Sequence, residues 1–342
     1  MNSLRAGANV NSRLTAVPSV QLTGGEDRPT SSLPPISAVV PTRNRAVVLS
    51  RTLESLRNQG PLPAEIIVID GSDDRETHQV VSEFSTQLET GQCRVRWQAA
   101  AVLGAAVQRN QGVALAAQPV IAFFDDDILF ETDCIARLWD ALQSDIRLGG
   151  VNAMIVNQRY QPPGRVSRLM FWLMAGRSEA SYAGRVLGPA VNLLPEDRDD
   201  LPEVVSVEWL NLGCTLYRRE ALPQPPFPKN FTGYSLMEDL CLSLSVGKEW
   251  KLANARTARI YHDSQTGSHK NDPVVSSQME LVNRHYVMTD VMGKRRLGDY
   301  ARFASWELFQ LATSALQKRG GMGFWRELCG KWLGVYHLLN AK

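Results

Sequence analysis

Three short runs of apolar residues, each stopped abruptly by a polar or turn-forming residue, constrain the fold of this chain most strongly. Residues 36–40 (ISAVV), 65–70 (EIIVID) and 119–124 (PVIAFF) are too short for helices and contain few polar side chains. Runs of this kind are typical of strands that are buried on both faces of a sheet. Pro41, Gly71 and a triple aspartate follow the three runs. The sequence therefore predicts short buried strands that end in polar turns.

Segments of helical periodicity separate these runs. Residues 46–59, 76–88 and 104–117 have the spacing or composition of helices, and residues 94–98 alternate like a strand. Alternating strands and helices with short loops predict an α/β fold, with a Rossmann-like, mostly parallel sheet flanked by helices. The polar residues after each strand would then lie along the carboxyl edge of the sheet, where open α/β sheets bind their ligands.

The second half of the chain alternates less regularly. The strands expected there are residues 150–157, 204–208, 213–218 and 251–261, and residues 238–248 are expected to form a helix. From about residue 271 the pattern is mostly helical.

Basic residues predominate in this helical part. Between Lys294 and Lys342 there are nine Lys or Arg residues against three acids, and the helices have apolar faces. Two interpretations stay open: the helices lie on an anionic membrane surface, or they pack on the catalytic domain or a partner subunit.

These patterns predict three parts. Residues 1–34 are rich in Ser, Thr, Asn, Gly and Pro and are expected to be a disordered arm. Residues 35–270 are expected to form the α/β domain, with a nucleotide-binding half at 35–130 and an acceptor and catalytic half at 131–270. Residues 271–342 are expected to be a helical C-terminal extension.

Composition excludes several classes of protein. The chain has 342 residues, 44% of them hydrophobic, and a formal charge of +2, so it lacks the basic field of a nucleic-acid binder. Its five cysteines are scattered, which fits a reducing cytoplasm and argues against a disulfide framework or a zinc site. We expect neither a secretory signal nor a membrane-spanning segment, because no apolar run is long enough.

Three adjacent carboxylates, Asp125, Asp126 and Asp127, follow an apolar strand. Like charges this close raise one another's pKa unless a cation lies among them. Mg²⁺ and Mn²⁺ prefer oxygen ligands and commonly combine carboxylates with phosphate oxygens. One interpretation is therefore a divalent metal that holds a diphosphate. The other is a solvated acidic turn that caps the following helix.

A series of motifs resembles the family 2 glycosyltransferases, which have the A-type glycosyltransferase (GT-A) fold. Six elements occur in the family's order and spacing between residue 36 and about 263. They are VVPTRNR (39–45), VIDGSDD (68–74), GAAVQRNQG (104–112), FFDDD (123–127), LGCTLYRREAL (212–222) and MEDLCLSLSVGKEWKL (237–252), followed by Tyr261-His262.

The resemblance implies a nucleotide site along the first strands. Pro41, Thr42 and Arg45 would line the nucleotide pocket, and Asp70 would accept a hydrogen bond from a uracil or thymine imide. Many relatives carry two acids where this chain has Ile69-Asp70, and a turn-forming role for Asp70 stays open. Arg109 would approach the base or the diphosphate; its alternative is an exposed arginine on a helix.

The resemblance also implies a metal site. Asp125 would contact the ribose or sugar side of the donor, Asp127 would coordinate Mn²⁺ or Mg²⁺, and Asp126, between them in the donor-site motif, would face solvent. His262 matches a histidine that touches the metal or diphosphate in some relatives, although a purely structural histidine is the alternative. The segment at Gly213 would form a wall beside the donor sugar.

The family pattern makes Asp239 the catalytic base and gives Glu238 a role in orienting the acceptor. Asp239 would take the proton of the acceptor hydroxyl as that oxygen attacks the anomeric carbon, which inverts the anomeric configuration. The alternative is that both acids stabilise the first turn of a helix through its dipole.

The expected function is therefore metal-dependent, inverting transfer of a sugar from a nucleotide diphosphate donor, UDP- or dTDP-linked, to a hydroxyl of a saccharide or lipid-linked acceptor. Processive synthases of the family carry a Q-x-x-R-W element and transmembrane helices, and this chain has neither. A role in surface polysaccharide or glycolipid synthesis follows, in the cytoplasm or on the inner face of the cell membrane. The apolar stretch 169–174 and the C-terminal helices would suit a lipid-linked acceptor.

Other functions fit less well. A dinucleotide dehydrogenase or a sugar nucleotidyltransferase needs a Gly-rich loop after the first strand, where this chain has Pro41-Thr42-Arg43-Asn44. A P-loop NTPase needs G-x-x-x-x-G-K, and a haloacid-type phosphatase needs an aspartate on the first strand. The remaining rival is a catalytically silent GT-A module that binds nucleotide sugar or scaffolds a polysaccharide assembly complex. Retention of Asp127, Asp239 and His262 together argues against it.

Overall fold

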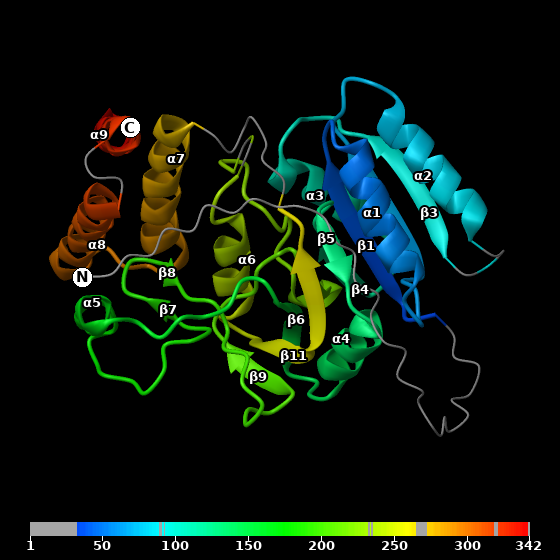
Figure 1. The fold of residues 1–342 in the computed structure, drawn as a ribbon, viewed down its shortest axis with the longest axis horizontal. Coiled ribbons are helices and arrows are strands. Elements are labelled where there is room, and N and C mark those ends of the chain that lie inside the picture. The colour runs from blue at the N-terminus through cyan, green and yellow to red at the C-terminus, as the bar shows by residue number, and fades with distance from the viewer. Residues whose placement is uncertain are drawn as a thin grey trace, which may run out of the picture. The chain divides into compact units, whose positions relative to one another are not determined.

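A nine-stranded mixed sheet lies at the centre of the fold (Figure 1). In the computed structural model the strands follow the order β3-β2-β1-β4-β10-β6-β11-β5, with β9 paired to β11. The structure describes residues 33–88, 91, 93–231, 233, 235–264, 272–317 and 321–340. Nearly all of the arm expected at 1–34 lies outside the described residues.

The first half of the sheet is parallel, as the sequence predicts. Strands β1 (Ile36–Thr42), β2 (Glu65–Asp70), β3 (Arg94–Ala99) and β4 (Val120–Phe124) pair in parallel. Helices α1 (Ala46–Arg57), α2 (Glu76–Gln87) and α3 (Ala105–Leu115) connect them. The mostly parallel sheet flanked by helices is confirmed.

Side-chain alternation in β1 explains how the sheet is covered on both faces. Val40 packs in one apolar cluster with Leu49 and Leu53 of α1, whereas its neighbour Val39 packs in a second cluster with residues of α3. Helix α3 lies so close to the sheet that a Cβ at Gly112 would collide with Val39. This close packing holds α3 against β1.

The second half of the sheet changes direction. Strand β10 (Cys214–Arg218) runs antiparallel to both β4 and β6 (Leu148–Ile155), and β11 (Lys251–His262) runs parallel to β6. The predicted strands of this half are present within a few residues of their expected ends. The other elements are β5 (Ile128–Phe130), α4 (Cys134–Gln143), β7 (Val186–Leu187), β8 (Val191–Asn192), β9 (Val204–Val207), η1 (Arg219–Ala221) and α6 (Glu238–Val246).

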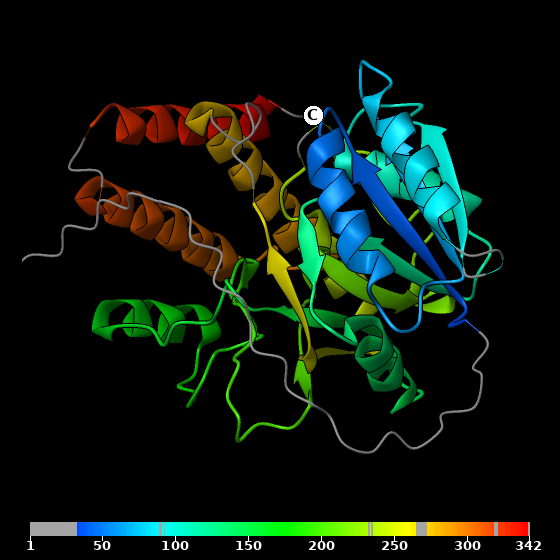
Figure 2. The ribbon, with the colours of Figure 1, turned by 45° about the vertical axis from the view of Figure 1, so that its right-hand side comes forward.

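Helices α5 (Arg165–Ala175), α7 (Pro273–Tyr286), α8 (Leu297–Gln317) and α9 (Met322–Asn340), with the π-helical turn η3 (Val287–Val291), form a helical layer beside the sheet (Figures 1 and 2). Most of them belong to the helical extension expected at 271–342. Among the described residues, no helix combines the length and apolarity that a membrane span requires.

A buried polar network holds these helices together. The Lys331 ammonium of α9 lies 2.5 Å from Glu307 of α8 and 3.2 Å from Glu280 of α7, and Arg284 of α7 contacts both carboxylates at 3.1 and 2.6 Å. Removing one member of a buried ion pair costs about 3–5 kcal/mol, because the partner is left buried and uncompensated. The network therefore fixes how α7, α8 and α9 pack.

The helical layer also reaches the loop before α6. The Asn283 amide of α7 donates a hydrogen bond to the Leu236 carbonyl at 2.8 Å, and the ring of Tyr286 packs edge-on against Phe231. Helix α7 thus supports the loop that leads into the acid pair at Glu238 and Asp239.

Candidate active site

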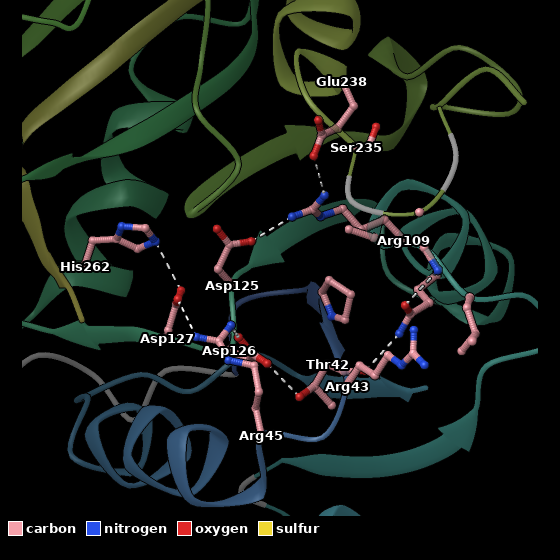
Figure 3. Close-up of a pocket in the computed structure, with 16 residues that line it drawn as sticks. Thr42, Arg43, Arg45, Arg109, Asp125, Asp126, Asp127, Ser235, Glu238 and His262 are labelled. Carbon is pink, nitrogen blue, oxygen red and sulfur yellow. Dashed lines mark hydrogen bonds and ion pairs between the residues drawn. The ribbon is translucent and has the colours of Figure 1, made fainter. Parts of the chain in front are cut away.

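Two adjoining pockets open where β1, β4 and β11 end. The larger has a volume of about 400 Å³ and the smaller about 210 Å³, and both are lined by Arg109, Asp125, Ser235, Glu238 and His262. Of the other predicted site residues, the larger pocket is lined by Pro41, Thr42, Arg45, Asp126 and Asp127, and the smaller by Gly213 and Asp239. The structure thus brings nine acidic, basic and polar side chains of the predicted set, with Pro41 and Gly213, to one region. Figure 3 shows those that line the larger pocket.

Strand register places the acidic loop beside His262. Strand β11 pairs antiparallel with β5, so that His262 lies opposite Ile128, the residue after the triple aspartate. The His262 Nε2 atom lies 3.1 Å from Asp127 Oδ1. Because β5 follows the acids, they do not cap a helix, and the interpretation as a helix-capping turn is wrong.

Asp125, Asp127 and His262 form a candidate metal site. One ligand atom from each residue lies within 4.8 Å of the other two. Two carboxylate oxygens and an imidazole nitrogen form a donor set that a divalent cation accepts, and the remaining positions would be open to water or phosphate oxygens. Asp127 and His262 are the metal ligands that the sequence predicts, and Asp125, which was expected to contact the ribose or sugar side of the donor, lies within reach of the same cation.

Asp126 is buried, which corrects the prediction that it faces solvent. It is 4% exposed, and its carboxylate accepts hydrogen bonds from Thr42 Oγ1 at 2.7 Å and Arg45 at 2.6 Å. Burial raises the pKa of Asp126 to about 7, although Arg45 and Thr42 oppose that shift. Asp126 thus joins the acidic loop to the end of β1 and to Arg45.

Arg45 spans two of the three acids. Its second guanidinium nitrogen lies 2.8 Å from Asp127 Oδ2. Burial opposes ionisation of Asp127, but the hydrogen bonds with His262 and Arg45 hold its pKa well below the usual range. Asp127 is therefore a carboxylate over the whole physiological pH range, as a metal ligand must be.

The surroundings of His262 suit a metal ligand. Its Nδ1 atom lies 2.7 Å from the Ser264 hydroxyl and 2.9 Å from the Gln158 amide nitrogen. Metal binding through Nε2 needs the ring proton on Nδ1, and the Ser264 oxygen can accept a hydrogen bond from that N–H group. In that tautomer Ser264 orients the ring.

Arg109 is buried and joins the candidate metal site to the acid pair. It is 4% exposed and lies 2.7 Å from Asp125 and 3.2 Å from Glu238 (Figure 3). Burial alone would lower the pKa of Arg109, yet the two carboxylates raise it. The alternative of an exposed helical arginine is therefore wrong.

Glu238 and Asp239 begin helix α6, as the sequence predicts. Met237, before them, has a left-handed backbone with φ of 69°, which turns the chain sharply into the helix. Asp239 Oδ1 accepts a hydrogen bond from the Leu240 backbone N–H at 2.7 Å. Burial raises the pKa of both carboxyls above their ordinary values.

Comparison with known proteins supports the same fold. Residues 37–181 match the family model described as glycosyl transferase family 2. Over these residues the chain is similar to the family 2 glycosyltransferases. The match includes the strands β1 to β4 and the triple aspartate.

Curated relatives of this domain are named glycosyltransferases. Validoxylamine A glucosyltransferase of Streptomyces hygroscopicus subsp. limoneus is 36% identical over 104 residues, which cover 29% of this chain and 22% of the relative. A PGL/p-HBAD biosynthesis glycosyltransferase of Mycobacterium tuberculosis (strain ATCC 25618 / H37Rv) is 30% identical over 143 residues, which cover 40% of this chain and 55% of the relative. The chain thus spans between about a fifth and about half of the length of these relatives.

Two solved structures share the fold of this chain. The mannosyltransferase PcManGT from Pyrobaculum calidifontis, in complex with GDP-Man and Mn²⁺, has a TM-score of 0.52 at 13% identity, covering 91% of this chain and 89% of that one. GalNAc-T7 with UDP, GalNAc and Mn²⁺ has a TM-score of 0.51 at 16% identity, covering 72% and 50%. The GT-A-like architecture is confirmed.

Asp70 is the predicted site residue that lines neither of the two pockets. It is buried, and its carboxylate accepts hydrogen bonds from Trp97 Nε1 at 3.0 Å and the Ser72 backbone N–H at 2.9 Å. The second of these bonds is typical of an aspartate that begins a turn. Both oxygens are therefore engaged within the protein.

Five charged or polar side chains that line the pockets were not predicted as site residues from the sequence: Arg43, Gln108, Gln158, Asn211 and Ser235. Gln108 donates to the carbonyls at the ends of β1 and β2, at Thr42 and Ile69. Ser235 is buried, lines both pockets, and has a hydroxyl without a hydrogen-bond partner among the described residues. Its place shortly before the acid pair is the signal by which it could have been found.

Proposed function

We propose that this chain is a metal-dependent, inverting glycosyltransferase that moves a sugar from a nucleotide diphosphate donor to an acceptor hydroxyl. The supporting observation is that the candidate metal site of Asp125, Asp127 and His262 shares its pocket region with the acid pair at the start of α6. A divalent cation bound there would neutralise charge on the leaving diphosphate. The imidazole ligand favours Mn²⁺ over Mg²⁺, which prefers oxygen ligands.

Arg45 is proposed to contact the donor diphosphate. In the structure its guanidinium lies against Asp126 and Asp127. A cation on Asp127 would compete for that carboxylate and leave one arm of Arg45 available to a phosphate oxygen, a bidentate partner that arginine binds well. Pro41 and Thr42 line the same part of the pocket.

Asp239 is proposed to be the catalytic base. It would accept the proton of the acceptor hydroxyl while that oxygen bonds to the anomeric carbon and the bond to the leaving phosphate breaks. A pKa raised by burial makes its carboxylate a stronger base than an ordinary aspartate. Glu238 is held by Arg109, so we assign it the role of orienting the acceptor.

The donor base and the acceptor are further parts of the proposal. A UDP- or dTDP-sugar was expected through Asp70, and because Trp97 and Ser72 engage that carboxylate, GDP-sugars are equal candidates. The solved neighbours hold GDP-Man or UDP with Mn²⁺. We propose a saccharide or lipid-linked acceptor in surface polysaccharide or glycolipid synthesis, with peripheral contact to the inner membrane face.

The division of the chain is also proposed: a catalytic domain at 35–270 and a helical extension at 271–342. The bond from Asn283 to the Leu236 carbonyl supports a role of the extension in holding the catalytic loop.

Donor turnover tests the proposed activity. Wild type would be incubated with Mn²⁺ and each of UDP-, dTDP- and GDP-sugars, with release of the nucleoside diphosphate measured and the anomeric configuration of any product read by NMR. We expect one donor class to be consumed with inversion. Asp239→Asn should turn over at least about a hundredfold more slowly, while Glu249→Gln, an exposed acid just after α6, should match wild type. If neither wild type nor Glu249→Gln consumed any donor, the silent-module interpretation would replace this one.

A further inference from the structure

Helices α5, α8 and α9 form an outer layer on one side of the protein. They lie side by side in both views, with α8 between α5 and α9 (Figures 1 and 2). Their inner sides are packed: Met174 of α5 and Trp306 of α8 join one apolar cluster, and Gly330 of α9 lies against the backbone of α7 at Val274. The outer sides have no protein partner among the described residues.

Helix α5 presents an apolar stripe to solvent. Val166, Leu169, Trp172 and Leu173 are all exposed, Val166 to 71%. Their spacing places them on one face of the helix, and the opposite face carries Met174 into the core. Packing among the residues that the structure describes does not explain a stripe in this arrangement.

Helices α8 and α9 also expose apolar side chains. Leu308 and Leu316 of α8 are 66% and 81% exposed, and Trp325, Trp332 and Tyr336 of α9 are exposed to between 61% and 70%. Tryptophan and tyrosine combine an apolar ring with a polar N–H or O–H. They are enriched at interfaces where the ring contacts apolar groups and the polar end contacts water. We call the exposed sides of α5, α8 and α9 together the outer helical face.

The exposed charged side chains of helices α5, α8 and α9 are basic, although one of them, Arg326, pairs with the half-exposed Asp272 before α7 at 3.1 Å. Arg165 and Arg168 of α5, Arg302 of α8 and Arg326 of α9 are exposed. None of the acids in these three helices is: Glu307 is buried against Lys331, the Asp299 carboxylate accepts the Arg296 backbone N–H, and Glu327 accepts the Ser314 hydroxyl.

This combination of exposed rings, aliphatic side chains and arginines selects one kind of partner. A second copy of the chain docked symmetrically on the face would bring arginines toward arginines. An anionic lipid surface instead offers a hydrocarbon boundary for the rings and phosphates for the guanidinium groups. Because none of these helices spans a membrane, they would lie in the plane of the interface.

We propose that the outer helical face docks the protein on an anionic bilayer surface. The proposal that this face docks on a bilayer rests only on the exposed residues. The further proposal that docking presents a lipid-linked acceptor to the pocket rests on the proposed function. Helix α7 connects the two regions, since it packs on α9 and donates the Asn283 bond to the loop before Asp239.

Vesicle flotation of the full chain tests docking. Phosphatidylcholine vesicles with and without phosphatidylglycerol would be used, with wild type, Trp325→Ser/Trp332→Ser and Arg165→Glu/Arg168→Glu. Ile146→Ser removes an equally exposed apolar side chain outside the face and is the matched control. We expect wild type and the control to float with the anionic vesicles, and each double variant to bind at least about tenfold more weakly.

Two results would overturn the proposal: no flotation of folded wild type with anionic vesicles, or equal flotation of all variants. A concentration-dependent dimer that disappears in the tryptophan variant would assign the face to a second copy instead. Thermal melting of each variant with Mn²⁺ and donor keeps this test separate from the proposed function. The double variants should bind donor as wild type does, and loss of donor binding in all proteins would count against the activity and not against docking.

Discussion

Arg109 offers a prediction whose size and pH dependence both follow from the structure. Its guanidinium is 4% exposed and contacts Asp125 and Glu238, whose side chains are 30% and 12% exposed. In Arg109→Met these two carboxylates lose their shared cation. Breaking a fully buried pair costs about 3–5 kcal/mol, and since Asp125 is partly solvated we expect a loss of about 2–4 kcal/mol in the free energy of unfolding at neutral pH.

The loss should depend on pH. Burial already raises the pKa of Glu238 to about 7 in the wild type, and without Arg109 it rises further. A carboxyl whose folded pKa exceeds its unfolded value loses stability as pH rises through the folded pKa, because the unfolded state releases its proton first. The difference between wild type and Arg109→Met should therefore be small at about pH 5 and largest above about pH 8.

Urea unfolding at these two pH values measures the effect. Arg218→Met is the matched control. Arg218 is also largely buried, but its guanidinium donates hydrogen bonds to the Leu148 and Leu142 carbonyls. Its substitution should destabilise the protein by a similar amount at both pH values. If Arg109→Met lost equal stability at both, or more at the lower pH, the reasoning from the buried carboxylates would be refuted.

Three further predictions concern the base, the metal site and the helical layer. The rate of transfer should fall as pH decreases through the Asp239 pKa of about 6, because a protonated base cannot accept the acceptor's proton; a flat pH–rate profile down to about pH 5 would argue against Asp239. His262→Ala should raise the Mn²⁺ concentration needed for donor binding by about 10–100-fold, measured by titration, and an unchanged requirement would remove His262 from the site. Lys331→Met should lower the free energy of unfolding by about 3 kcal/mol in urea titrations, since Glu280 and Glu307 would lose their cation, and wild-type stability would contradict that account.

The parallel half of the fold could be predicted because its signals are local. Strands such as β2 are buried on both faces and read as continuous apolar runs, and α1 shows its buried leucines at helical spacing. Strand β5 and helix α4 were missed. The first has three residues, too few for periodicity, and its position depends on pairing with β11 more than a hundred residues away.

The site residues were predicted from sequence motifs. The predictions that proved wrong concern residues whose environment is set by tertiary contacts. Three adjacent aspartates look equivalent in sequence, but Thr42 and Arg45 lie beneath the middle one and draw Asp126 into the interior. Arg109 looks like a surface residue of a polar helix until the acid pair, 129 residues later, is packed against it. Such pairings are not encoded in local spacing.

The C-terminal helices show the converse case. The spacing of their apolar residues predicted helix faces that pack against a membrane or a protein surface. In the structure Trp332 and Leu316 are exposed to solvent. Periodicity identifies a face but not its partner, which is why the sequence left membrane and protein contact as alternatives.

The central claim is that Asp125, Asp127 and His262 hold a divalent cation that binds a nucleotide-sugar donor. Thermal melting of wild type and Asp127→Asn with UDP-, dTDP- and GDP-sugars, each with and without Mn²⁺, tests it most directly. The account predicts a rise in melting temperature for one nucleotide class that requires both Mn²⁺ and Asp127. A rise of equal size in Asp127→Asn or without metal, or no rise with any donor, would contradict it.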